Sequence, residues 1–204
     1  TPLYSSAASD VYKRQVPGAI LFDLGIGDPK ARPTAENGYQ AAISASSDEI
    51  TQGTVGAGTG ATVSKFGGME NAIKGGIGSV TTKMNDGFSV GALIAVNSSG
   101  DIQDPESGIL IAGSRRGERQ FESSLNLLRT SSGQTLLSED TNTTIGIVAT
   151  DAPINVEQAN RLAIMAHSGI ARTIVPSYGK GDGDTLFVVS KEEPALEYDY
   201  DGSL

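Results

Sequence analysis

Residues 142–171 read NTTIGIVATDAPINVEQANRLAIMAHSGIA, and the hydrophobic pattern changes its period within this stretch. The continuous apolar run of residues 144–149 is typical of a buried β-strand. From Asn155 to Ala171 the apolar residues recur at helical spacing, which predicts an amphipathic helix. The predicted apolar face of this helix consists of Val156, Ala159, Ala163, Ala166 and Ile170.

The flanking sequence extends this pattern of strands and helices. Two apolar segments, 77–84 and 88–96, flank Asn85-Asp86-Gly87 and predict a β-hairpin, because these residues tolerate the positive φ of a tight turn. We also expect a strand over 185–189, helices over 34–46 (with Thr34 as N-cap) and 119–129, a loop over 98–117 and a polar linker over 131–141. The predicted fold class is therefore α/β or α+β, with helices covering sheets.

The composition excludes several classes of function. The 204 residues carry a net charge of −9, which opposes binding to a nucleic-acid backbone. The chain has no Cys and a single His, His167, which we expect in the core. Thiolate catalysis, a Cys-ligated metal site and a Ser-His-Asp triad are thus disfavoured, and we expect neither metal nor cofactor. The longest apolar run, 90–96, is too short to cross a membrane, so a soluble, cytoplasmic protein is expected.

The glycine-rich residues 53–65, GTVGAGTGATVSK, permit two interpretations. They contain G-x-G-x-x-A, but neither an apolar strand before it nor a complete Walker pattern, so a nucleotide site is the weaker interpretation. Glycines that let the backbone pack closely against another element are the simpler one. Lys65 ends this loop, and a lysine in a crowded pocket can have a lowered pKa and transfer protons.

A nucleophile is predicted where the polar linker meets the buried strand. A Thr at the start of that strand, once made N-terminal by chain cleavage, can use its own α-amine as general base and needs neither His nor Cys. Asn142-Thr143-Thr144 also fits the N-glycosylation pattern, as does Asn97-Ser98-Ser99. Residues 179–185, GKGDGDT, form either half of a calcium loop or a Gly-Asp turn.

Five segments together resemble the L-aminopeptidase/D-esterase family, which includes DmpA-like aminopeptidases, β-peptidyl aminopeptidases and the nylon-oligomer (6-aminohexanoate oligomer) hydrolase. They are GTVGAGTGATVSK (53–65), KGGIGS (74–79), VGALIAVNSSGD (90–101), NTTIGIVATDAP (142–153) and GDGDTLFVVS (181–190). The resemblance implies a four-layer αββα sandwich of the N-terminal-nucleophile type, here truncated. It also implies a homo-oligomer, a tetramer of αβ units, which cleaves small peptides, amino-acid amides or esters, or oligoamides.

Transferred residue by residue, the resemblance implies self-cleavage between Asn142 and Thr143, with Thr143 as the catalytic nucleophile. Asn97 matches the asparagine that binds the oxyanion or orients the nucleophile. Lys65 matches a lysine beside the nucleophile in the nylon-oligomer hydrolase branch.

Three further positions complete the implied site. Asp182 and Asp184 match an acidic pair close to the Thr amine and hydroxyl, and they could also hold a substrate ammonium group. Phe22 stands where that branch has a tyrosine, so the pocket lacks one hydroxyl donor here.

The resemblance also suggests how the chain is organised. Residues 1–15 lack any periodicity and are interpreted as a non-native scar, and 16–204 as one hydrolase domain cut into 16–142 and 143–204. Compared with the family, about the first third and the last helix are missing. An inactive or non-catalytic binding or assembly domain of the same fold is therefore the competing hypothesis.

Overall fold

The structure, a computed structural model, describes residues 17–118, 120–130 and 142–190. The predicted scar at 1–15, the polar linker at 131–141 and the acidic C-terminal residues 192–204 lie outside the described residues.

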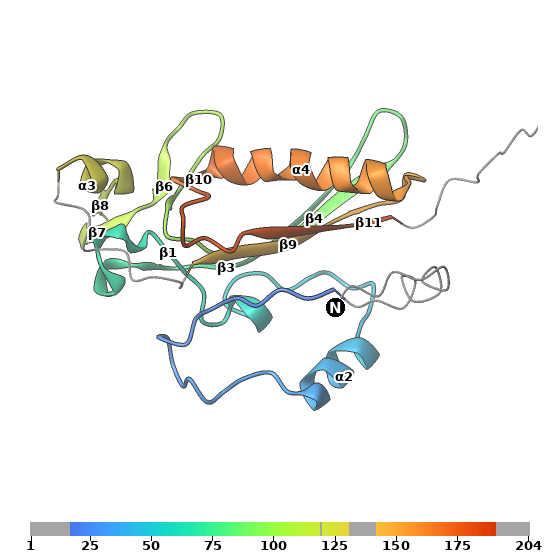
Figure 1. The fold of residues 1–204 in the computed structure, drawn as a ribbon, viewed down its shortest axis with the longest axis horizontal. Helices are drawn as coiled ribbons and strands as arrows, with labels where there is room; N and C mark the ends of the chain where they lie inside the picture. The colour runs from blue at the N-terminus through green and yellow to red at the C-terminus, as the bar shows by residue number, and fades with distance from the viewer. Residues whose placement is uncertain (1–16, 119, 131–141, 191–204) are drawn as a thin grey trace, which may run out of the picture.

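A four-stranded sheet forms the centre of the described chain (Figure 1). Its strands are β3 (Gly76–Lys83), β4 (Ser89–Asn97), β9 (Thr143–Thr150) and β11 (Thr185–Ser190), in the spatial order β11-β9-β4-β3. β3 and β4 form the predicted hairpin, and Gly87 in its turn has a φ of 95°. β9 runs antiparallel to β4 and parallel to β11.

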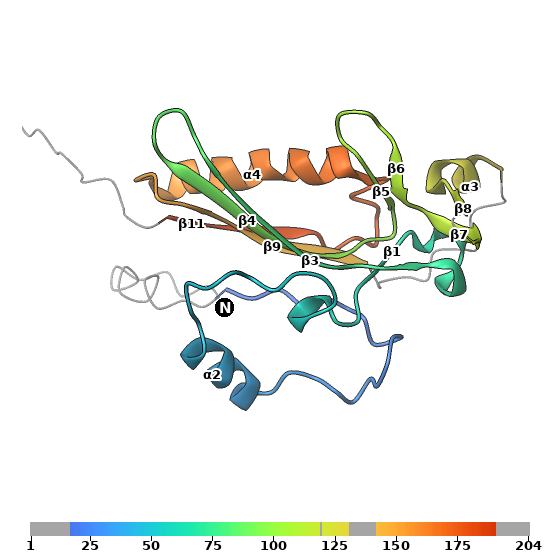
Figure 2. The same ribbon diagram turned by 180° about the vertical axis from the view of Figure 1, so that it is seen from behind.

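Helix α4 (Val156–Thr173) connects β9 to β11 and covers one face of the sheet (Figures 1 and 2). Its N-cap Asn155 and Gln158 form a reciprocal capping box, which satisfies main-chain donors at the helix start. Ile170 and Ile174 pack with Leu186 of β11 in the hydrophobic core. The prediction that Val156 lies on the buried apolar face is wrong, because Val156 is the first residue of α4 and remains 71% exposed.

Short elements surround this unit. Two predictions there are wrong, since residues 98–117 contain strands and Phe121 lies in a strand rather than a helix. These strands are only three or four residues long and pair with irregular registers, so they leave no alternating pattern in the sequence. The three small sheets comprise β1 (Thr62–Val63) with β2 (Ile73–Lys74); β10 (Ile174–Val175) with β5 (Asp101–Gln103) and β6 (Leu110–Ala112); and β7 (Ser114–Gly117) with β8 (Gln120–Glu122). The remaining helices are α2 (Ala35–Ile43), α3 (Ser124–Thr130) and the 3₁₀ turns η1 (Gly56–Gly58), η2 (Lys65–Gly67) and η3 (Met69–Asn71).

The fold class is mixed α/β, as predicted. Figures 1 and 2 show α4 on one side of the sheet and the N-terminal segment with α2 on the other. Thr34 caps α2 through a capping box with Asn37, as its position in the sequence predicted. Among the described residues, no helix is both long and apolar enough to span a membrane.

Candidate active site

The candidate site lies where the end of β4 meets the start of β9. Asn97, the last residue of β4, is the register partner of Thr143, the first residue of β9. Partners in an antiparallel pair direct their side chains to the same face of the sheet. Both side chains are buried, with 1% of Asn97 and 7% of Thr143 exposed.

Asn97 connects three separate segments of the chain. Its Oδ1 accepts hydrogen bonds from Lys65 Nζ at 2.9 Å and from the Thr62 main-chain N–H at 3.0 Å. Its Nδ2 donates to the main-chain oxygen of Phe22 at 2.8 Å. A buried amide with partners on both ends is held in one orientation, so Asn97 fixes the N-terminal segment and the glycine-rich loop relative to β4.

Lys65 is buried beside Asn97 at the start of η2. The preceding residue, Ser64, has a left-handed backbone conformation with a φ of 61°, and the Lys65 N–H donates to Ser99 O at 2.9 Å. Burial lowers the pKa of the Lys65 amine to about 8, although the negative charges of Asp182 and Asp23 act to raise it. An amine with this pKa exchanges protons near neutral pH.

The Thr143 hydroxyl lies against the peptide bond that precedes it. Thr143 Oγ1 donates to Asn142 O at 2.5 Å, and the Gly183 N–H donates to the same oxygen at 3.1 Å. Asn142 also forms an isolated bridge with Asp182, which anchors the peptide beside the 179–184 turn. The Thr143 hydroxyl and the carbonyl group of Asn142 are therefore adjacent.

The two aspartates lie in the turn that leads into β11. Asp184 Oδ1 accepts the Thr144 main-chain N–H at 2.6 Å, next to the candidate nucleophile. Burial, together with the charge of Asp182, raises the pKa of the Asp184 carboxyl, while the bond from Thr144 opposes that rise. Asp182 accepts from the Gly179 N–H at 2.6 Å and from Ser99 Oγ at 3.3 Å.

A small cavity of about 80 Å³ opens beside Lys65 and Asn97. Phe22, Asp23 and Met69 are among the other residues that line it. Sequence reasoning missed Asp23, which brings a carboxylate to the cavity and acts on the Lys65 charge. Its position next to Phe22 in ILFDL was the one available signal.

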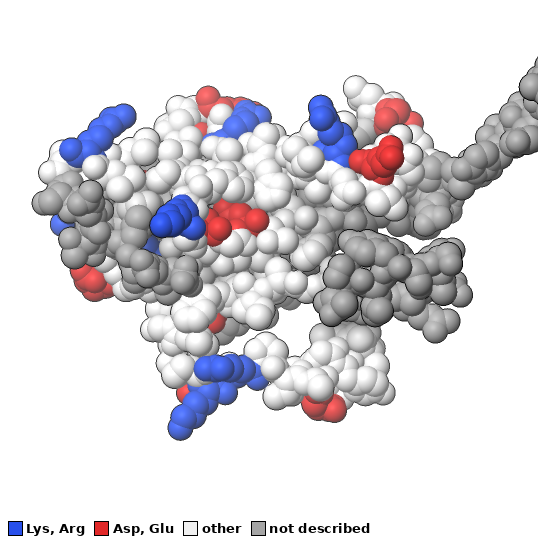
Figure 3. Space-filling model, viewed as in Figure 1, with Lys and Arg blue, Asp and Glu red and all other residues white. Residues whose placement is uncertain are grey.

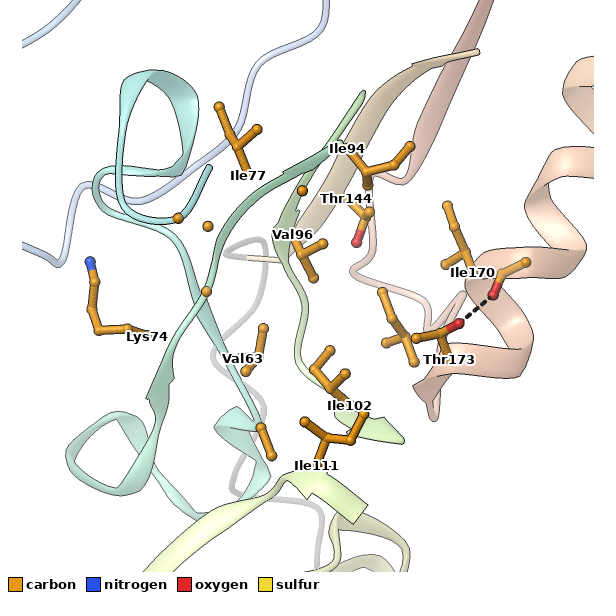
Figure 4. Close-up of a pocket in the computed structure, with 17 residues that line it drawn as sticks. Val63, Lys74, Ile77, Ile94, Val96, Ile102, Ile111, Thr144, Ile170 and Thr173 are labelled. Carbon is orange, nitrogen blue, oxygen red and sulfur yellow. Dashed lines mark hydrogen bonds between the residues drawn. The ribbon is translucent and has the colours of Figure 1, made fainter. Parts of the chain in front are cut away.

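A larger, mainly apolar cavity of about 520 Å³ lies between the sheet and α4 (Figure 4). Ile94, Val96, Thr144 and Ile170 point toward it. Since side chains alternate along a strand, Thr144 lies on the opposite face of β9 from Thr143. None of the predicted catalytic side chains lines this cavity.

The structure thus brings six predicted residues into one neighbourhood, linked by hydrogen bonds, strand pairing or electrostatic interaction. They are Phe22, Lys65, Asn97, Thr143, Asp182 and Asp184. Asn142, predicted to precede the cleaved bond, lies beside them. Gly183, which donates to Asn142 O, is a further residue that sequence reasoning missed, because a glycine between two aspartates resembles an ordinary turn.

The glycine-rich loop packs closely and does not lead into an α-helix. A Cβ on Gly58 would lie 2.7 Å from Ile77 N and 2.8 Å from Gly53 O, so the close-packing interpretation is confirmed. The loop leads through η1 into β1, and it therefore offers no α-helix N-terminus to a phosphate.

Burial and hydrogen bonding decide between the alternative interpretations of three other features: the two glycosylation patterns, the Gly-Asp segment and His167. Asn97 and Asn142 are buried, which leaves neither open to glycosylation in the folded chain. Asp182 closes the Gly-Asp turn, and the described residues contain no cluster of three or more His, Cys, Asp or Glu able to hold a metal ion. His167 is only half-buried rather than in the core, and its Nδ1 lies 2.6 Å from the Tyr178 hydroxyl.

Charged side chains of both signs are scattered over the face that Figure 3 shows. Lys and Arg occupy several separate places on this face, with Asp and Glu among them. On the face that the figure shows, the described residues therefore form no continuous basic stripe.

Comparison with known sequences gives consistent matches. The sequence profile of peptidase family S58 matches residues 15–200. An uncharacterised aminopeptidase of Mycobacterium bovis is 38% identical over 180 residues, which cover 86% of this chain and 50% of that protein. A 6-aminohexanoate-oligomer endohydrolase of Kocuria sp. is 27% identical over 185 residues, covering 87% of this chain and 50% of that protein. The chain spans about half the length of these curated relatives.

Two solved structures resemble the fold. A protein from Pyrococcus horikoshii OT3 superposes with a TM-score of 0.53 at 28% identity, covering 80% of this chain and 39% of that chain. An L-aminopeptidase D-Ala-esterase/amidase from Ochrobactrum anthropi, described as a variant of the Ntn hydrolase fold, gives a TM-score of 0.50 at 22% identity, with the same coverage. The second likeness concerns the fold alone.

Proposed function

Because this chain belongs to peptidase family S58, as the resemblance of its motifs indicated, we propose that it is the nucleophile-bearing part of a self-processing amide hydrolase. The nucleophile is Thr143. One observation carries this proposal: Thr143 Oγ1 lies 2.5 Å from the carbonyl oxygen of the peptide bond that would be cut. Cleavage there divides 16–204 into 16–142 and 143–204.

Turnover uses the amine that cleavage creates. The free α-amine of Thr143 takes the hydroxyl proton, and Oγ1 attacks the substrate carbonyl to form an acyl-enzyme that water hydrolyses. Lys65, with its lowered pKa, relays protons beside it. Asp184, which binds the adjacent Thr144 N–H, holds the α-ammonium group between proton transfers. Asn97 steadies the negative oxygen.

The substrate is an amide with a free amino group. The cavity beside Lys65 is small and is lined in part by Asp23, whose carboxylate would pair with a substrate ammonium. The names of the relatives, aminopeptidase and 6-aminohexanoate-oligomer endohydrolase, support amino-terminal peptides and oligoamides as the substrate classes. The working enzyme is a homo-oligomer of cleaved αβ units.

The test is the intact mass of the full-length protein, with N-terminal sequencing of any small fragment. Wild type and Thr143→Ser should yield a fragment that begins at residue 143, whereas Thr143→Ala should remain one chain. Thr150→Ala is a matched control, because Thr150 lies at the other end of β9 and is 8% exposed, close to the 7% of Thr143. Cleavage in Thr143→Ala would overturn the nucleophile, and a wild type that stays whole and hydrolyses no amide would favour a non-catalytic domain.

A further inference from the structure

The carbonyl oxygen of Asn142 receives two hydrogen bonds. Thr143 Oγ1 donates to it at 2.5 Å, and the main-chain N–H of Gly183 donates at 3.1 Å. This is the carbonyl of the peptide bond that self-cleavage breaks, so the inference rests on the proposed function.

The two donors have different fates during the reaction. To attack, Thr143 Oγ1 must leave the carbonyl oxygen and approach the carbonyl carbon. The π-electron pair then moves onto the oxygen, and the Gly183 N–H is the donor already placed on it. Collapse breaks the C–N bond and forms an ester to Oγ1, while the hydroxyl proton ends on the Thr143 nitrogen. Water later hydrolyses the ester.

The amide of Asn97 is directed elsewhere in the uncut chain. Its Nδ2 donates to Phe22 O at 2.8 Å, and its Oδ1 faces Lys65 Nζ at 2.9 Å. Asn97 therefore organises the surroundings of Thr143, while a different group contacts the oxygen of the peptide bond to be cut.

The absence of a side chain at position 183 fits the same assignment. A Cβ there would lie 3.2 Å from Thr143 Oγ1 and 3.8 Å from Thr143 Cγ2. Such a contact is tight for an oxygen that must move toward the carbonyl carbon. Glycine leaves that space open and still supplies an N–H.

We propose that the main-chain N–H of Gly183 is the oxyanion donor for self-cleavage at the Asn142–Thr143 bond. Asp182 and Asp184, on either side of it, fix the position of this N–H by binding the Gly179 and Thr144 main-chain N–H groups. Self-cleavage and substrate turnover then differ in their oxyanion donors, since Asn97 serves the second reaction.

The test compares two substitutions at the same position in the full-length protein. Gly183→Ala keeps the N–H and adds a Cβ, whereas Gly183→Pro adds a Cβ and removes the N–H. The rate at which precursor converts to the two fragments is followed by intact mass. We expect Gly183→Pro to cleave about 10²- to 10³-fold more slowly than Gly183→Ala, the usual effect of losing one oxyanion donor. Equal rates would overturn the proposal.

If the Gly183→Pro variant does not fold, hydrogen exchange of the Gly183 amide provides a second test of the proposal. In the uncut Thr143→Ala protein, the Gly183 amide should be strongly protected from hydrogen exchange, and the protection should drop in the cleaved enzyme. Exchange at the rate of an exposed amide in the uncut protein would contradict the assignment. Neither result tests the assignment of Thr143 as the nucleophile. That assignment is overturned only if the Thr143→Ala variant is itself cleaved.

Discussion

Lys65 Nζ lies 2.9 Å from Asn97 Oδ1 and 3.1 Å from the main-chain oxygen of the same residue. These bonds hold the buried Lys65 amine against Asn97, the residue that pairs with Thr143 on the adjacent strand. Burial favours the neutral amine and the nearby carboxylates favour the charged one, and the balance brings the pKa to about 8. This pair therefore places a group that titrates near neutral pH on the register partner of Thr143, the proposed nucleophile.

We predict that the rate of self-cleavage rises with pH and levels off above about pH 8. In the proposed mechanism, neutral Lys65 accepts the Thr143 hydroxyl proton, and the population of this form grows as the pH approaches the Lys65 pKa of about 8. The Thr143 α-amine, which also titrates near that pH, does not yet exist in the precursor. Rates of precursor conversion from pH 6 to 9.5 measure this profile.

Lys65→Arg should abolish this rise, because an arginine stays charged over the whole range. Lys74→Arg is the matched control, since Lys74 Nζ is exposed and donates to Thr59 O. A wild-type rate that does not change with pH would contradict the role of Lys65.

Two substitutions should move this midpoint in opposite directions. Asp182→Asn removes a charge that raises the pKa of Lys65, so the midpoint should fall below about 8. Asn97→Asp places a carboxylate about 2.9 Å from Lys65 Nζ, so the midpoint of the pH profile should rise. Asp28→Asn, an exposed position, should leave it in place. Shifts of the same sign in both site variants would refute the electrostatic account.

Phe22→Tyr should raise kcat/KM for amide substrates. Phe22 lines the small cavity, and a hydroxyl on its ring would add a donor there. One well-placed donor changes rates by up to about 10²- to 10³-fold, so an increase of about tenfold is a modest expectation. Phe88→Tyr is the control, because Phe88 is 39% exposed, close to the 40% of Phe22, and lies at the hairpin turn. An unchanged kcat/KM would mean that another group already supplies the donor.

Gly58→Ala should lower the free energy of unfolding by about 1–3 kcal/mol, the usual cost of forcing extra volume into a packed site. Its Cβ would lie 2.7 Å from Ile77 N, and main-chain atoms cannot move aside cheaply. Gly38→Ala, on α2 with nothing within 4 Å, should instead stabilise the protein by about 0.5–1 kcal/mol. Thermal unfolding of both variants measures the difference, and similar melting temperatures would contradict the close-packing interpretation.

Local sequence was sufficient to predict the elements that have a clear hydrophobic periodicity or characteristic turn residues. The strand at 144–149, the helix from Asn155 and the hairpin around Gly87 need only their own residues, because periodicity and turn chemistry act over a few positions. The short strands within 98–117 could not be predicted in this way. They are only three or four residues long, their pairings contain register irregularities, and their own residues carry no clear alternation.

The same division applies to the candidate site. By itself the sequence determined the residue types present, the family, and a chain without Cys whose chemistry relies on hydroxyl, amine, amide and carboxylate groups. Only the tertiary structure decided that Lys65 is buried against Asn97, that Asp23 lines the cavity, and that the Gly183 N–H contacts the Asn142 oxygen. The physical reason is that burial and hydrogen bonding depend on contacts between segments that are distant in sequence. The pKa values of side chains and the directions of hydrogen-bond donors depend on these contacts.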